Sequence, residues 1–205
     1  MGTEKKSHVV TDRDKWITAY HEAGHAIVSY FLPTQDPVHQ ISIIPRGMAA
    51  GYTMYIPNTD DQHVSRTKLN EQICSLLGGR AAEELTQDDV CTGASNDIQR
   101  ASELARNMVT KYGFSDRIGP LALGSQNEEV FLGRDFGSHQ NYSEEIASII
   151  DEEIKKIVIT QYDKARDLLR NNMTQLGHVA QLLFTNEKID GDEFREYMKN
   201  SLNAE

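Results

Sequence analysis

The sequence predicts a mainly helical domain with a small β-sheet or hairpin. Apolar residues recur every three or four positions in several long stretches without proline, which is the pattern of amphipathic helices. Residues 39–57 differ, because two short runs of β-branched and aromatic residues flank a glycine-containing turn. With 205 residues, of which 39% are hydrophobic and 25% charged, the chain is long enough to form one substantial globular core.

The first predicted helix begins near Asp12 and ends at about Leu32. Thr11 and Asp14 have the spacing of a capping box at its start. Pro33 stands just beyond its end, where a helix cannot easily continue. One stripe of this helix carries Ile17, His21, Gly24, His25 and Val28, so we expect the histidines to point into the protein.

A single domain is expected over residues 12–200. Residues 1–11 are polar and without periodicity, which predicts a flexible tail or linker stump. The longest apolar run, residues 26–32, is too short to cross a bilayer. The phosphate-binding pattern Gly-x-x-x-x-Gly-Lys-Ser/Thr is absent, so the chain is not expected to bind a nucleotide by that route.

The β region is expected to form two strands, at residues 40–44 and 52–56. Gly47 and Gly51 lie between them and favour a turn. The only other predicted strand is a short one at residues 121–123, inside a long loop. The remaining apolar stripes predict helices at residues 62–85, 97–112, 143–170, 173–184 and 191–198. In the first of these, the adjacent Gly78 and Gly79 mark a tight contact or a kink.

Net charge and cysteine content narrow the function classes. The formal net charge is -10, which disfavours nucleic acid or an anionic membrane as the main partner. Cys74 and Cys91 are far apart and form no Cys-x-x-Cys pair. Since no secretory signal is visible, we expect both to be reduced thiols in a cytoplasmic setting.

The strongest chemical signal is a His-Glu-x-x-His pattern in the first predicted helix. His21 and His25 are four residues apart, so on a helix they project from one face and can bind the same ion. Glu22 lies beside that ion, where it can act as the general base of a hydrolase. Buried histidines are often ordinary core residues, but this pattern arises by chance in only roughly one in a hundred chains of this length. We therefore predict a Zn²⁺ site with Glu22 as the catalytic residue.

A catalytic zinc site needs a third protein ligand, and spacing leaves three candidates. Val28 and Phe31 stand where a metzincin has glycine and histidine, so that class is excluded. Glu83 or Glu84 would suit an enzyme that takes a glutamate from a downstream helix. Asp97 follows a turn of small residues that lets the backbone approach another helix. Spacing alone does not choose among them.

Five motifs in order resemble the peptidase domain of FtsH-type AAA+ metalloproteases, and the resemblance covers residues 20–170. Besides the zinc motif, they are residues 44–47 with 51–52, 77–84, 92–97, and 131–134 with 142–145. The resemblance implies that Asp97 is the third zinc ligand and that Glu83 and Glu84 lie outside direct coordination.

The resemblance also implies a zinc-dependent endopeptidase that hydrolyses unfolded or membrane-extracted polypeptides. The expected assembly is a homohexamer. The parent protein would carry an AAA+ ATPase module and a membrane-spanning segment before this region, and would lie at the cytoplasmic face of the bacterial inner membrane. The present chain would then be a soluble protease domain without either part, and without a nucleic-acid partner.

Two other classes are considered. One is a non-catalytic, zinc-containing oligomerisation module, against which the intact Glu22 argues, because a closed structural site does not use such a carboxylate. The other is a peptide deformylase. In that class the cysteine ligand precedes the histidine motif, whereas both cysteines here follow it.

The second predicted strand is the expected substrate-binding site, through Gly51, Tyr52, Thr53 and Met54. An exposed sheet edge can pair with an extended peptide through main-chain hydrogen bonds, which suits a protease of broad specificity. Alternate amides along such an edge face outward, so either Thr53 or Met54 would offer its N–H to the peptide. The alternative is a hairpin that only covers the core.

Overall fold

The structure is a computed structural model of the chain. It describes residues 10–47, 49–57, 62–87, 89–123 and 142–202. The tail predicted over residues 1–11 therefore falls almost wholly outside the described residues, as does most of the predicted loop after residue 123. The elements are α1 (Asp12–Tyr30), β1 (Val38–Ser42), β2 (Tyr52–Tyr55), α2 (Arg66–Leu76), α3 (Gly78–Thr86), the 3₁₀ turn η1 (Thr92–Ala94), α4 (Ser95–Thr110), α5 (Glu144–Arg170), α6 (Met173–Asn186), β3 (Lys188–Asp190) and α7 (Gly191–Leu202).

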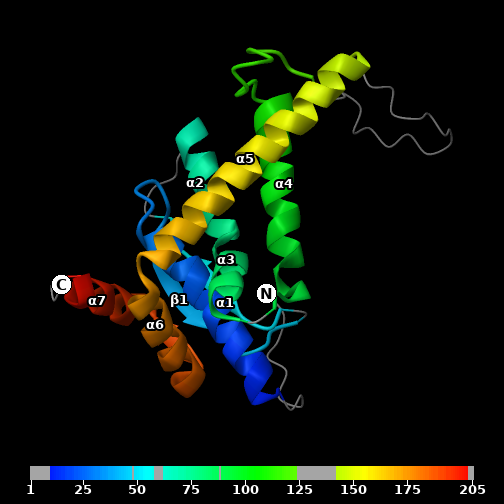
Figure 1. Cartoon of the computed structure of the whole chain (residues 1–205). Coiled ribbons are helices and arrows are strands. Elements are labelled where there is room, and N and C mark those ends of the chain that lie inside the picture. The colour runs from blue at the N-terminus through cyan, green and yellow to red at the C-terminus, as the bar shows by residue number, and fades with distance from the viewer. Residues whose placement is uncertain (1–9, 48, 58–61, 88, 124–141, 203–205) are drawn as a thin grey trace.

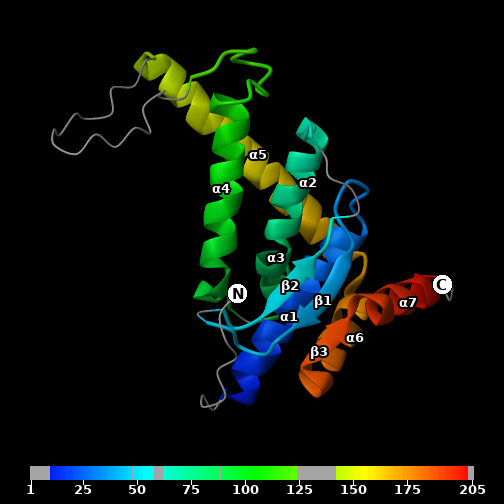
Figure 2. The ribbon, with the colours of Figure 1, turned by 180° about the vertical axis from the view of Figure 1, so that it is seen from behind.

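Helix α1 lies at the centre of the fold. The hydroxyl of Thr11 caps it by accepting the backbone N–H of Asp14 at 3.1 Å. Every residue from Glu22 to Ser29 is buried, so this half of the helix is covered on all sides. The sheet covers one face, and α3 and α6 pack on others (Figure 1; Figure 2). The His-Glu-x-x-His pattern therefore lies at the start of a fully buried stretch of this central helix.

Glycines set the distance between α1 and α3. A Cβ on Gly24 would lie 2.5 Å from the carbonyl oxygen of Gly78 and 2.6 Å from the Cβ of Ala82. The two backbones approach this closely only because side chains are missing at the crossing. The prediction of a tight contact at the adjacent glycines is confirmed. The close approach of the two helices also explains why Gly24 stands inside α1, although glycine costs a helix about 1 kcal/mol relative to alanine.

The sheet has three antiparallel strands in the order β2-β1-β3. The hairpin of β1 and β2 is confirmed, and Arg46 and Ala49 exchange two backbone hydrogen bonds of 3.0 Å in the turn between them. Gly47 has a φ of 62° in this turn, a conformation that favours glycine. Because β1 lies in the middle, β2 is an edge strand, as Figure 2 shows.

The sequence missed one strand and predicted one that the structure lacks. The sequence did not predict β3, whose three residues bury only Ile189 and are too short to show a period of two. It forms because Ile189 pairs with Ile41 of the central strand, a contact that follows from tertiary packing. The strand expected at residues 121–123 is absent. Leu121 is 53% exposed there, and Leu123 donates its N–H to the carbonyl of Thr110 at the end of α4.

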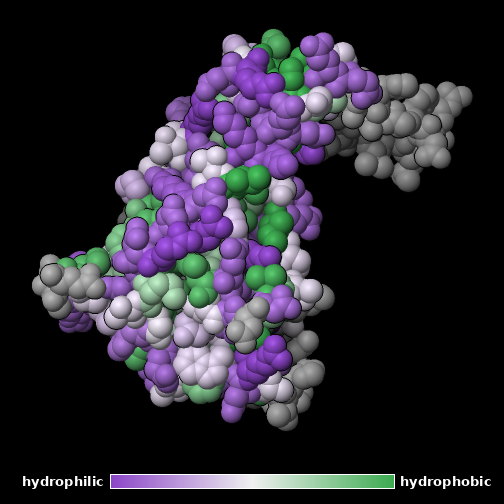
Figure 3. Space-filling view, viewed as in Figure 1, coloured by the Kyte–Doolittle hydropathy of each residue, from purple (hydrophilic) through white to green (hydrophobic). Residues whose placement is uncertain are grey.

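Helices α4 and α5 form a second packing unit with α2. The long α5 begins where Ser143 accepts the N–H of Ile146, and it crosses the molecule from the α4 end to α6 (Figure 1). Its outward face is mainly hydrophilic (Figure 3). The apolar residues between these helices form their own cluster, which includes Leu69, Ile73, Ala105 and Met108. Among the described residues, no helix combines the length and apolar character that crossing a membrane requires.

Candidate metal centre

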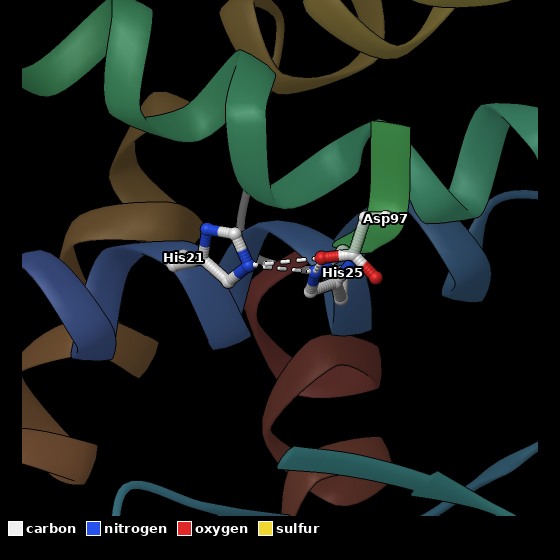
Figure 4. A group of neighbouring side chains, drawn as sticks. All are labelled: His21, His25 and Asp97. Atoms are coloured by element: carbon white, nitrogen blue, oxygen red, sulfur yellow. Dashed lines mark hydrogen bonds and ion pairs between the residues drawn. The ribbon is translucent and has the colours of Figure 1, made fainter. Parts of the chain in front are cut away.

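Three side chains from two helices meet at one point. His21 and His25 project from α1, and Asp97 projects from the first turn of α4 (Figure 4). The Nε2 atoms of the histidines are 3.0 Å apart, and Oδ2 of Asp97 lies 3.4 Å from each of them. Ligand atoms around a tetrahedral zinc ion, with bonds of about 2.0 Å, lie about 3.3 Å apart. The residues present therefore fit a zinc ion.

Each histidine is oriented through its outer ring nitrogen. Nδ1 of His25 lies 2.8 Å from the carbonyl oxygen of Ser75, to which it donates a hydrogen bond when that nitrogen is protonated. Nδ1 of His21 lies 2.7 Å from Oε1 of Glu83. A proton on Nδ1 leaves the lone pair on Nε2, so both rings direct their free electron pairs at the space beside Asp97.

The two glutamates considered as ligands occupy different positions. Glu83 is buried and contacts the outer nitrogen of His21 rather than the space between the histidines. Its second oxygen accepts the N–H of Cys91 at 3.1 Å, so it links α3 to the segment that leads to Asp97. The carboxylate of Glu84 turns toward α5, where it accepts a hydrogen bond from Tyr162. The structure thus brings Asp97, and neither glutamate, beside the Nε2 atoms of both histidines.

The charges of the site favour a cation. Burial by itself would lower the pKa of His21, but hydrogen bonds to Asp97 and Glu83 raise that pKa to about 10. Burial by itself would raise the pKa of Asp97, but its contacts with His21 and His25 hold that pKa well below the usual range. The carboxylates of Asp97 and Glu83 stabilise a positive charge on His21, and the same negative surroundings suit a metal ion bound beside that ring.

Glu22 lies on α1 beside the three converging side chains, and only 6% of its surface is exposed. Burial raises the pKa of its carboxyl group, while the nearby imidazoles of His25 and His21 and the hydroxyl of Thr53 oppose this change. That hydroxyl lies 2.8 Å from Oε2 of Glu22. A buried carboxylate next to a cation site is suitably placed to accept a proton from an attacking water.

Gly79 keeps space open for both imidazoles. A Cβ at this position would lie 2.5 Å from Cε1 of His21 and 2.6 Å from Nε2 of His25. The backbone of α3 therefore passes directly over the ligand atoms. The sequence marked this glycine as a close contact, but it did not identify the histidines as its partners.

A cleft opens over the metal centre, and the edge strand β2 forms one wall. Of the four residues predicted to bind substrate, Gly51, Tyr52 and Thr53 line this cleft and Met54 does not. The sequence did not indicate Tyr55, which also lines the cleft and whose hydroxyl lies 3.4 Å from the carbonyl oxygen of His25. Other residues of the lining include Gln35, Asp36, Lys68, Gln72, Asn96 and Arg100.

The register of the sheet distinguishes Thr53 from Met54. Ile43 donates its backbone N–H to a carbonyl beside β3, so the amide of Ser42 faces the other way, toward β2. Ser42 pairs with Tyr52. Tyr52 and Met54 therefore direct their amides at β1, and Thr53 directs its amide at the open edge.

The sequence matches the model of peptidase family M41 over residues 8–197. It is 53% identical over 196 residues to the ATP-dependent zinc metalloprotease FtsH of Caldicellulosiruptor bescii, a match that covers 96% of this chain and 32% of that protein. It is 51% identical over 205 residues to the ATP-dependent zinc metalloprotease FtsH of Pseudothermotoga lettingae, covering 100% of this chain and 33% of that protein. The chain thus spans about a third of the length of these curated relatives. It belongs to peptidase family M41.

Proposed function

We propose that this chain is a zinc-dependent endopeptidase in which His21, His25 and Asp97 hold the metal and Glu22 is the general base. The observation that carries the proposal is the convergence of the three side chains beside a buried carboxylate. Membership in a peptidase family, and relatives named zinc metalloproteases, support the same chemistry. When bound, zinc supplies Lewis-acid chemistry, in that it acidifies a water molecule and polarises the scissile carbonyl.

Glu22 then performs the proton transfers. Its carboxylate accepts the proton of the attacking water and returns it to the departing amine, so peptide hydrolysis proceeds without a covalent enzyme intermediate. Thr53 and the imidazoles counter the effect of burial on the pKa of this group, which favours the ionised form that a base requires.

The substrate is proposed to be an unfolded polypeptide that pairs with β2. Thr53 presents its amide at the open edge, and the cleft beside it contains the metal centre. Main-chain pairing ignores side-chain identity, which suits the hydrolysis of many sequences. Gly51 and Tyr52 continue the same wall of the cleft.

In the parent protein, the domain is proposed to act within a homohexamer, after an AAA+ ATPase module and a membrane segment at the cytoplasmic face of the bacterial inner membrane. The length of the relatives, about three times that of this chain, and the words "ATP-dependent" in their names support the ATPase module of this arrangement. The ATPase would deliver membrane-extracted or unfolded chains to the cleft.

The alternative of a non-catalytic zinc module is less well supported. The matched family is a peptidase family, and Glu22 is present and buried at the point where a base is needed. The same family membership separates this chain from peptide deformylases.

Metal analysis combined with hydrolysis of unfolded casein tests the proposal. The purified chain should contain one zinc per subunit and cleave casein without ATP. A chelator should abolish cleavage, and added Zn²⁺ should restore it. Glu22→Gln should keep the zinc and lower hydrolysis by about 100-fold or more, the contribution of a general base. A variant that cleaves as fast as the wild type would exclude Glu22 as the base.

A further inference from the structure

Thr53 contacts the catalytic helix through its side chain. Its hydroxyl oxygen lies 2.8 Å from Oε2 of Glu22 and 3.3 Å from the backbone oxygen of the same residue. An ionised carboxylate can only accept hydrogen bonds, so the hydroxyl is the donor. With one proton to give, it bonds best to the nearer atom, the carboxylate oxygen. The edge strand is thus tied directly to the proposed base.

A second residue before the strand restricts the same carboxylate. A Cβ on Gly51 would lie 2.8 Å from Oε1 of Glu22 and 2.9 Å from its Cγ. The backbone of Gly51 therefore packs against one carboxylate oxygen, while the Thr53 hydroxyl binds the other. Glutamate has three side-chain torsions, and contacts on both oxygens restrict them to the orientation that faces the cleft.

The two faces of Thr53 have different partners. Its side chain lies over α1, and its amide faces the open edge where a peptide strand can pair. The amide that would bind the peptide and the hydroxyl that binds Glu22 therefore belong to the same residue. A peptide docked on this edge is placed in a fixed relation to the carboxylate.

We propose that Thr53 is a positioning residue, whose hydroxyl holds Glu22 in the orientation for proton transfer while its amide aligns the substrate. This inference rests on the proposed function, because it assigns the role of one residue in that reaction. Positioned hydrogen bonds of this kind restrict a base to its reactive geometry.

Thr53→Val is the decisive variant, because it removes the hydroxyl and keeps the β-branched shape and the amide. We expect kcat for an unstructured peptide to fall by about 10-fold to 100-fold. KM and zinc content should stay near wild type, because the edge and the metal ligands are unchanged. Thr53→Ser, which restores the hydroxyl, should recover most of the lost rate.

Thr110→Val is the matched control. Thr110 is buried, and its hydroxyl donates a hydrogen bond to a helix carbonyl, that of Arg106, at 2.8 Å. It lies thirteen residues after Asp97 on α4, about 20 Å along the helix. Its variant should keep the wild-type kcat. The proposal is overturned if Thr53→Val keeps kcat, if its loss of rate follows loss of zinc, or if Thr53→Ser is equally slow.

A readout without catalysis tests the contact itself. In metal-free protein, Thr53→Val should lower the urea midpoint of unfolding when Glu22 is present and leave it nearly unchanged in a Glu22→Ala background. Equal shifts in both backgrounds would overturn the proposal. A zinc-loaded wild type that fails to cleave peptide would overturn the proposed function itself. An active wild type whose kcat is unchanged by Thr53→Val would overturn only the role of Thr53.

Discussion

The carboxylate of Glu83 lies 2.7 Å from Nδ1 of His21, although 62 residues separate them in the sequence. Its other oxygen accepts the N–H of Cys91, which leads into the turn before Asp97. One buried carboxylate therefore orients a proposed zinc ligand and the segment that carries another. Such partners fix the ring orientation of histidine ligands and raise their basicity.

Replacement of Glu83 by glutamine should weaken zinc binding by about 10-fold to 100-fold, the usual effect of losing such a partner. Glutamine replaces one carboxylate oxygen by an NH₂ group, which donates, so it cannot present an acceptor to both His21 and Cys91 as the two carboxylate oxygens do. Competition with a chromophoric chelator measures the affinity. Glu84→Gln is the control, because that carboxylate binds Tyr162 and Arg166 on α5, and it should keep wild-type affinity.

Replacement of Asp97 by alanine should remove most of the zinc, because Oδ2 is the only carboxylate oxygen that lies beside both Nε2 atoms in the described site. Elemental analysis of the purified variant gives the metal content. Glu83→Ala should retain more metal than Asp97→Ala. The reverse order would show that the ligand assignment is wrong.

Gly79→Ala should also remove most of the zinc, for a steric reason. The added methyl would lie 2.5 Å from His21 and 2.6 Å from His25, so at least one imidazole must move. Gly177→Ala on α6 is the control, since a Cβ there meets nothing within 4 Å. That control should bind zinc normally and unfold at a slightly higher temperature, because alanine favours a helix over glycine by about 1 kcal/mol. Zinc content near wild type in Gly79→Ala would show that α3 does not confine the ligands.

Proline on the edge strand should separate substrate binding from folding. Thr53→Pro removes an outward-facing amide, so the protein should keep its helicity and zinc while KM for an unstructured peptide rises and kcat falls. Met54→Pro removes an amide that faces β1 and should destabilise the fold. Circular dichroism, metal content and peptide kinetics distinguish the two. A folded, metallated Thr53→Pro with normal KM would show that substrate does not pair with this edge.

The two thiols should differ in reactivity with a thiol reagent. Burial raises the pKa of Cys74 to about 12, so at pH 8 only roughly one thiol in ten thousand is ionised. The thiolate is the reactive form, so Cys74 should become reactive only as the pH rises toward 12 or as the protein unfolds. Cys91 is partly exposed. Native protein at pH 8 should therefore titrate one thiol, and Cys91→Ser should titrate none.

Much of the fold could be predicted because its signals are local. The caps at Thr11 and Ser143 contact residues only three positions away, and helical periodicity repeats within a few turns. The pairing of His21 with His25 is equally local, since one helical turn separates them. For these features the sequence determines both the element and the face on which a residue lies.

Other features depend on contacts between distant segments, which periodicity does not encode. Spacing alone did not choose between Asp97 and Glu83, because their positions relative to the histidines are set where α3 and α4 meet α1, 62 or more residues along the chain. Ile189 became a strand residue because it pairs with Ile41. The outward amide of Thr53 follows from the position of β1 between two strands, since hydrogen-bond direction in a sheet is set by which neighbours are present.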